Sequence, residues 1–269
     1  MSFSIAGKTA IVTGAANGIG LAIGRHFADK GANVMFADID ESRLLDELGG
    51  RSEEENISYF AGDLRERLTI ANLISATIDA YEQIDILVNG ARQVIATDPL
   101  DGDDDSVRQL IDQNLMPALR LSQHVAKRMI KQTEEDESDE DQPAGTIINL
   151  SSIAARRTHP NLLAYSVSSA ALDQLTRSLA VALAPNRIRV NAIALGSVMS
   201  ASLQSTLKEN RTFRDDIEKH TPLARIAPAT ELAETAQFLA SEASGFMTGQ
   251  ILTLDGGRTL LDPVAAPAH

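Results

Sequence analysis

The chain has 269 residues, 17 of them glycine and none of them cysteine, and its formal net charge is −13. A chain without cysteine cannot form a disulfide scaffold or a Cys-ligated zinc or iron–sulfur site. The negative charge argues against nucleic acids and anionic membranes as partners, because phosphates and lipid headgroups would be repelled. The histidines are scattered without metal-ligand spacing, so we expect no metal site.

The acidity lies in three short segments, with seven acids in 134–141, four in 101–105 and three in 53–55. The first of these falls inside the polar stretch 133–143, which we expect to be an acidic surface loop. No apolar run approaches the roughly 20 residues that a membrane-spanning helix requires. Residues 1–8 lack the basic start and apolar core of a signal peptide, so we expect a cytoplasmic protein.

Short apolar runs alternate with stretches of helical periodicity along the whole chain. The predicted strands are 8–13, 33–38, 57–61, 84–89, 145–151, 188–192 and 250–254. The predicted helices are 19–30, 66–83, 106–131, 163–184 and 229–242. This alternation predicts a parallel sheet with right-handed crossovers, covered by helices on both faces. Because no linker divides the pattern, we expect one doubly wound, Rossmann-like α/β domain over residues 1–269.

A glycine-rich turn at 13–20, with the sequence Thr-Gly-Ala-Ala-Asn-Gly-Ile-Gly, joins the first predicted strand to the first predicted helix. Glycines allow a sharp turn there and let a pyrophosphate approach the N–H groups at the helix N-terminus. The position between strand and helix favours a dinucleotide site over the alternative of an ordinary tight turn. The predicted cofactor contacts in this turn are Gly14, Asn17, Gly18, Ile19 and Gly20.

The second predicted strand ends at Asp38, 18 residues after Gly20, and Ile39 follows it. A carboxylate at this place can accept both ribose hydroxyls of an adenosine and would repel a 2′-phosphate, which favours NAD(H) over NADP(H). The alternative is an acid in a solvated turn. Asp63, which follows the third strand, is a candidate for the adenine edge.

These and later motifs resemble those of the short-chain dehydrogenase/reductase family over nearly the whole chain. The matching motifs are the turn at 13–20, Asp63-Leu64, Asn114, Ile148–Ser152, Tyr165 at 13 residues after Ser152, Arg189–Ala194, Thr248–Gln250 and Asp255–Gly257. The resemblance implies a seven-stranded sheet in the order 3-2-1-4-5-6-7 and a homodimer or homotetramer. It also implies hydride transfer between a nicotinamide cofactor and a small alcohol or carbonyl substrate.

The resemblance assigns roles to individual residues. Tyr165 would exchange the hydroxyl proton, Ser152 would hydrogen-bond the substrate oxygen, and Asn114 would hold a water in a proton relay. Further cofactor contacts are implied at Leu64, Asn89, Gly90, Ala91, Tyr165, Ser169, Gly196 and Val198. The segment 197–222 follows the sixth strand at the carboxyl edge of the sheet, where ligands bind, and is expected to form a substrate lid.

Three positions depart from the family pattern. Ser169 stands four residues after Tyr165, where the family has a lysine that activates the tyrosine and binds the nicotinamide ribose. The fourth strand is followed by Gly-Ala-Arg at 90–92, where the family usually has Asn-Ala-Gly. The sixth strand ends with Leu-Gly at 195–196, where the family has Pro-Gly.

Two functions therefore stay open. In the first, the chain is a working NAD-dependent oxidoreductase in which Arg92, Arg156 or Arg157 replaces the missing cation in space, since arginine is permanently charged. In the second, the chain binds NAD as a regulatory or structural subunit with weakened or lost catalysis. For each arginine, a solvated surface position is the alternative. The retained serine, tyrosine and asparagine favour the enzyme.

Overall fold

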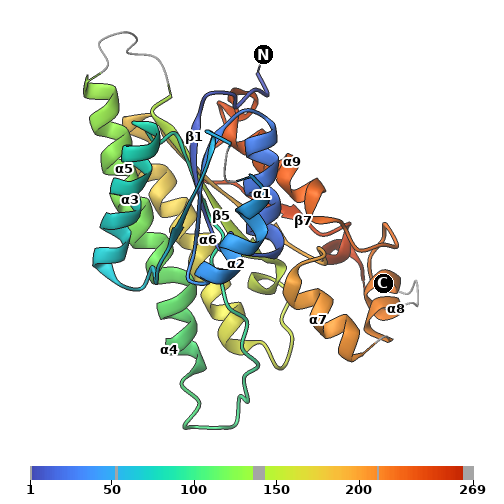
Figure 1. Cartoon of the computed structure of the whole chain (residues 1–269). Helices are drawn as coiled ribbons and strands as arrows, with labels where there is room; N and C mark the ends of the chain where they lie inside the picture. Colours follow the sequence, from blue (N-terminus) through green and yellow to red (C-terminus); the bar gives the residue numbers. More distant parts are fainter. Residues whose placement is uncertain (1, 52–53, 136–142, 211, 263–269) are drawn as a thin grey trace.

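The computed structural model describes residues 2–51, 54–135, 143–210 and 212–262, and the chain folds around a seven-stranded sheet (Figure 1). The strands are β1 (Thr9–Thr13), β2 (Asn33–Asp38), β3 (Ile57–Ala61), β4 (Ile86–Asn89), β5 (Gly145–Ser152), β6 (Ile188–Leu195) and β7 (Ile251–Leu254). They lie in the order β3-β2-β1-β4-β5-β6-β7, and all neighbouring strands pair in parallel. The predicted fold class and strand order are confirmed.

Helices cover both faces of the sheet, as the near-continuous apolar strands predict. The helices are α1 (Gly18–Asp29), α2 (Glu41–Leu48), α3 (Arg67–Tyr81), α4 (Ser106–Leu110), α5 (Met116–Glu135), α6 (Leu163–Leu183), α7 (Ala201–Glu209), α8 (Thr212–Lys219) and α9 (Ala229–Ala240). Short 3-10 turns are η1 (Gly49–Arg51), η3 (Ile153–Ala155), η4 (Ala184–Asn186), η5 (Glu242–Ser244) and η6 (Arg258–Leu260).

Two apolar cores lie on opposite faces of the sheet, with α1 and α9 on one side and α3 and α5 on the other (Figure 1). Phe27 of α1 and Leu239 of α9 belong to the first core, and both side chains are fully buried. Leu73 of α3, Val125 of α5 and Ala180 of α6 belong to the second. The apolar periodicity of each helix therefore faces the sheet, and the strand ends remain available for ligands.

The predicted helix 106–131 differs from the structure in two ways. A π-helical turn, η2 (Ile111–Leu115), separates α4 from α5, and α5 continues to Glu135. The side chain of Asn114 in this turn bonds to the backbone of Gln93, a tertiary contact that no helical periodicity reveals. Of the predicted acidic loop 133–143, the first three residues are thus helical, and 136–142 lie outside the described residues.

The predicted lid 197–222 contains the two helices α7 and α8, which lie beside the carboxyl end of the sheet (Figure 1). The sixth strand is three residues longer than predicted and reaches Leu195, so this segment starts directly at the sheet edge. Within the described ranges, none of the helices is long and apolar enough to cross a membrane.

Candidate active site

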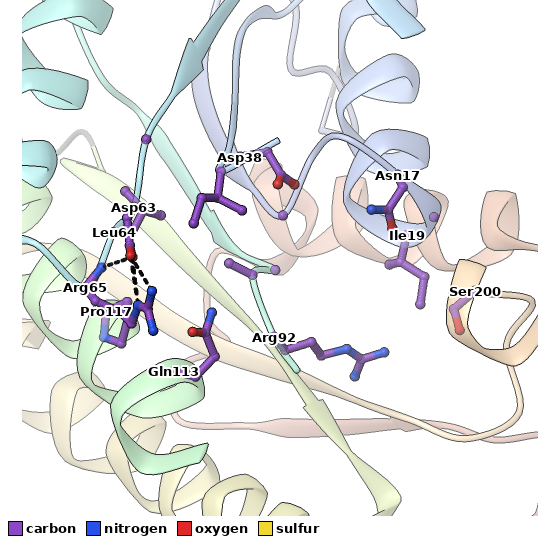
Figure 2. A pocket seen from close by; sticks show the side chains of 16 residues that line it. Asn17, Ile19, Asp38, Asp63, Leu64, Arg65, Arg92, Gln113, Pro117 and Ser200 are labelled. Carbon is purple, nitrogen blue, oxygen red and sulfur yellow. Dashed lines mark hydrogen bonds and ion pairs between the residues drawn. The ribbon is translucent and has the colours of Figure 1, made fainter. Parts of the chain in front are cut away.

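A cleft of about 270 Å³ opens at the carboxyl ends of β1, β2, β3 and β4 (Figure 2). Ten of the residues predicted to contact a cofactor line it: Gly14, Asn17, Gly18, Ile19, Asp38, Ile39, Asp63, Leu64, Gly90 and Ala91. They come from four strand ends that are separated in sequence and adjacent in the sheet. This is the edge at which open parallel sheets bind ligands.

The glycine-rich turn forms one wall of the cleft, with Asn17 and Ile19 pointing towards it (Figure 2). Gly14 adopts a φ of +68°, and a Cβ atom there would lie 2.7 Å from the carbonyl oxygen of Gly90. A Cβ atom on Gly20 would lie 2.1 Å from the carbonyl oxygen of Gly14. Since Asn17 makes no side-chain cap, the first N–H groups of α1 stay open to an anion. The turn therefore fits a pyrophosphate.

Asp38 lies at the end of β2 and faces the cleft (Figure 2). Its carboxylate accepts hydrogen bonds from the backbone N–H of Ala16 at 2.9 Å and of Asp40 at 3.2 Å. These bonds tie the end of β2 to the glycine-rich turn and fix the direction of the carboxylate. A fixed acid beside an anion-binding turn suits a ribose with free hydroxyls.

Arg65 contributes a cation to the same cleft, and its guanidinium points at Asp63 (Figure 2). Arg65 donates to both carboxylate oxygens of Asp63 at 2.5 to 2.9 Å, which holds the pKa of Asp63 below its usual range. Arg65 was not predicted as a cleft residue, although its spacing of two residues from Asp63 was visible. Four further lining residues were not predicted either: Gly62, which directly precedes Asp63, and Gln113, Pro117 and Ser200, for which no sequence motif gives a signal.

Tyr165 lies on α6 with only 7% of its surface exposed, and its hydroxyl has a cationic partner. Nη1 of Arg92 lies 3.1 Å from the Tyr165 hydroxyl oxygen and 3.3 Å from the carbonyl oxygen of Ser151. Arg92 belongs to the segment after β4, and its side chain lines the cleft (Figure 2). Among the three arginines proposed from the sequence, Arg92 is the one with a recorded contact to Tyr165.

The other two arginines bind elsewhere. Arg156 donates to Oγ1 of Thr253 at 3.3 Å and lies 4.0 Å from the carboxylate of Asp173. Arg157 donates to the carbonyl oxygen of Thr259. Both side chains are thus directed towards β7 and the chain that follows it.

Asn114 fixes the segment that carries Arg92. Its side-chain oxygen accepts from the N–H of Gln93 at 2.8 Å, and its side-chain nitrogen donates to the carbonyl of Gln93 at 2.9 Å. The same nitrogen lies 3.4 Å from the hydroxyl of Ser168. The π-helical turn, a distortion frequent at functional sites, thereby connects the residue after Arg92 to α6.

Ser152 ends β5, and its buried hydroxyl accepts the N–H of Ala154 at 3.1 Å. The preceding Ser151 donates to the buried carboxylate of Asp173 at 2.5 Å. Burial raises the pKa of Asp173, and the Ser151 bond and the Arg156 charge oppose that effect. The end of β5 is therefore held rigidly against α6.

Ser169 and Tyr165 both line a second, smaller cavity. Other residues around it include Asn89, Ala91, Arg92, Asn114 and Ser168. Gly196 and Val198 line neither cavity, and their backbone N–H groups bond to Leu254 and Gly196 respectively. Gly20 also lines neither cavity, and the absence of a Cβ atom there allows the turn to pack closely on Gly14. In the described parts of the chain, no three His, Cys, Asp or Glu residues gather into a metal site.

Comparisons with known proteins agree with this arrangement. Residues 14–259 match the family described as enoyl-(acyl carrier protein) reductase. Oxidoreductase UcpA of Salmonella typhimurium is 34% identical, over 97% of this chain and 98% of that protein. A crystal structure of a putative gluconate dehydrogenase from Agrobacterium tumefaciens covers 97% of this chain and 99% of its own, with a TM-score of 0.87 and 28% identity.

A second solved structure is a gluconate 5-dehydrogenase from Burkholderia cenocepacia in complex with NADP and tartrate. It is 30% identical to this chain, has a TM-score of 0.85, and covers 97% of this chain and 98% of its own. Its similarity therefore extends over the dinucleotide cleft and the second cavity alike.

Proposed function

Because the chain belongs to the short-chain dehydrogenase/reductase family of oxidoreductases, we propose that it transfers a hydride between NAD(H) and an alcohol or carbonyl substrate. The observation that carries this proposal is the 3.1 Å hydrogen bond between Arg92 and the Tyr165 hydroxyl. It supplies a cation at the acid/base tyrosine, where Ser169 leaves the family lysine absent. A chain that only bound NAD would not need this contact.

The cleft residues divide the binding of the cofactor between them. The turn from Gly14 to Gly20 would hold the pyrophosphate, Asp38 the adenosine ribose, and Asp63 with Leu64 the adenine. Nicotinamide, when bound, supplies or accepts the hydride. The similar Burkholderia protein was solved with NADP, so our proposal of NAD depends on the acid at position 38, whose charge opposes a 2′-phosphate.

The protein residues would handle the proton. The Tyr165 hydroxyl would take a proton from an alcohol or give one to a carbonyl, and Ser152 would hydrogen-bond the same substrate oxygen. Arg92 would hold the Tyr165 hydroxyl in place through its hydrogen bond at 3.1 Å, in a buried position where water screens its charge only weakly. Arginine cannot itself exchange the proton at ordinary pH, so its part is to stabilise charge and to orient Tyr165.

Asn114 would act by holding its neighbours in place. Both polar atoms of its side chain bond to Gln93, which fixes the backbone next to Arg92.

We also propose that 1–269 forms one catalytic domain with 197–222 as its lid, since Ser200 of that segment borders the cleft. A homodimer or homotetramer through α5 and α6 is supported by exposed apolar side chains on α6, including Val181 at 78%.

The test measures cofactor binding and turnover separately. Isothermal titration with NAD and NADP should give the lower Kd for NAD, and NADH formation should appear with an alcohol panel and accelerate at alkaline pH. Tyr165→Phe should bind NAD unchanged and lose turnover. Binding of NAD without turnover on any alcohol or carbonyl compound would instead support the binding-only subunit.

A further inference from the structure

The ends of β5, β6 and β7 lie side by side next to the proposed catalytic serine. Ser152 pairs in register with Leu195, and Leu195 pairs with Leu254. The segments that follow these three strands therefore leave the sheet at one edge. Their side chains are the ones that a substrate would meet beyond the reacting oxygen.

Two arginines from these segments meet at the turn η6. Arg157 follows Ser152 by five residues and donates to the carbonyl oxygen of Thr259. Arg258, the neighbour of Thr259, donates from Nη1 to the hydroxyl of Ser197 at 3.0 Å. One arginine thus connects the end of β5 to η6, and the other connects η6 to the end of β6. Both are exposed to solvent.

Neither arginine has an acidic partner within 4.0 Å among the described residues. Asp255 lies nearby in sequence, but its carboxylate accepts the backbone N–H groups of Gly257 at 2.9 Å and Thr259 at 2.7 Å. By contrast, Arg225 next to this region is paired with Glu231 at 2.9 Å. In a chain of net charge −13, these two arginines therefore bring uncompensated positive charge to the edge of the sheet beyond Ser152.

We propose that Arg157 and Arg258 bind an anionic group of the substrate, whose hydroxyl or carbonyl carbon lies at Tyr165 and Ser152; this inference rests on the function proposed above. Guanidinium groups have five N–H donors in a planar fork that matches carboxylate and phosphate oxygens. Each arginine donates the hydrogen bond described above to an uncharged oxygen, so that other N–H groups of its guanidinium can bind a ligand. The substrate class is a hydroxy acid or a phosphorylated alcohol.

The reaction on a hydroxy acid balances with the proposed cofactor alone. The alcohol carbon loses a hydride to NAD+, the hydroxyl proton passes to the tyrosine and then to solvent, and an oxo acid with NADH results. The anionic group is unchanged in this step. The two arginines therefore hold the substrate and take no part in proton or hydride transfer.

Matched pairs of compounds test the proposal, each pair differing in the anionic group. The pairs are gluconate and gluconamide, lactate and lactamide, and glycerol 3-phosphate and glycerol. For at least one pair the wild-type enzyme should show a higher kcat/KM on the anion, and the responding pair identifies carboxylate or phosphate. Added salt should reduce the preference, because exposed charges are screened.

The variant is Arg157→Gln combined with Arg258→Gln, and the matched control is Arg128→Gln. Arg128 also bonds only to uncharged atoms, those of Gln132 and Glu82, but it lies at the opposite edge of the sheet. The double variant should lose at least about tenfold in the ratio of kcat/KM for anion over neutral compound. The control should keep the ratio, and the Kd for NAD should stay unchanged in both.

A second readout does not require turnover. Tartrate, titrated calorimetrically into the protein with NADH, should bind to the wild type and to the variant that combines Arg157→Lys with Arg258→Lys. It should bind at least about tenfold more weakly to the double glutamine variant. Equal kcat/KM on anion and neutral compound, or an unchanged ratio in the double glutamine variant, would overturn the anion site and leave the proposed oxidoreductase standing. Tartrate binding that depends on both arginines, without NADH formation on any compound, would support the anion site and overturn the proposed function.

Discussion

Replacing Arg92 by glutamine tests the origin of the positive charge at Tyr165. The Arg92 nitrogen lies 3.1 Å from the tyrosine hydroxyl, and Tyr165 is 7% exposed. Hydrogen bonds to charged groups contribute about 1.5–3 kcal/mol. Since each 1.36 kcal/mol is tenfold in rate, loss of this charged hydrogen bond at the reacting hydroxyl should lower kcat roughly 10- to 150-fold. The KM for NAD should change little.

The assay is NADH formation across a range of pH at saturating NAD. Without Arg92 the Tyr165 hydroxyl loses its charged hydrogen-bond donor, so the rate should be lower than that of the wild type at every pH in the range. Arg92→Lys keeps the charge and should retain part of the rate. Combining Arg92→Gln with Ser169→Lys should restore activity, because the second change returns a cation to α6 one helical turn from Tyr165.

An Arg92→Gln enzyme with the kcat of the wild type would refute this reasoning. A second refuting result would combine two findings: Ser169→Lys alone changes the Kd for NAD, and Ser169→Lys added to Arg92→Gln restores no activity. The cation at position 169 would then act on the cofactor alone. Tyr165→Phe is the reference for complete loss of the acid/base group. The Arg92 variants should remain above it.

Three further predictions concern the cofactor, the packing and the pH dependence of stability. Asp38→Asn removes the charge that opposes a 2′-phosphate, so the ratio of Kd for NADP over NAD should fall at least about tenfold in calorimetric titrations. Gly24→Val should lower the free energy of unfolding by about 1–3 kcal/mol in urea, since even a Cβ there would lie 2.3 Å from the buried ring of Phe36. Burial raises the pKa of Asp85, which also accepts the N–H of Thr9 at 2.7 Å. The stability that this acid contributes is present at low pH and falls as pH rises through its raised pKa, so Asp85→Asn should gain stability relative to wild type as the pH rises above the ordinary pKa of an aspartate.

Most of the fold was predictable because it depends on local patterns. Each strand is a short apolar run, each major helix repeats apolar residues on one face, and parallel order follows from their alternation. The break at 111–115 was not predictable, because apolar periodicity continues through it. Within this turn the side chain of Asn114 bonds to Gln93 on a different segment, a tertiary contact that the apolar pattern does not contain.

The candidate site also contains residues that were predictable from the sequence and residues that were not. Residues of the cleft that follow strand ends, such as Gly14, Asp38 and Asp63, were predictable because a parallel sheet brings its carboxyl ends together. The partner of Tyr165 was not, since Arg92 is 73 positions away in sequence. Arg92, Arg156 and Arg157 all follow strands at the same edge of the sheet, but their side chains point in different directions. Only the structure shows that Arg92 is the one of the three that bonds to Tyr165.

The place from which Arg92 reaches Tyr165 has a consequence for the enzyme. A lysine on α6 would belong to the same helix as the tyrosine, whereas Arg92 belongs to the segment that packs on the glycine-rich turn. The Thr13 hydroxyl accepts the N–H groups of Gly90 and Ala91 at 3.0 and 3.2 Å. Because that backbone also lies against Gly14, the segment that carries Arg92 and the glycine-rich turn form one packed unit. Arg92 is thus positioned by the wall of the cleft, whereas a lysine at position 169 would be positioned by α6.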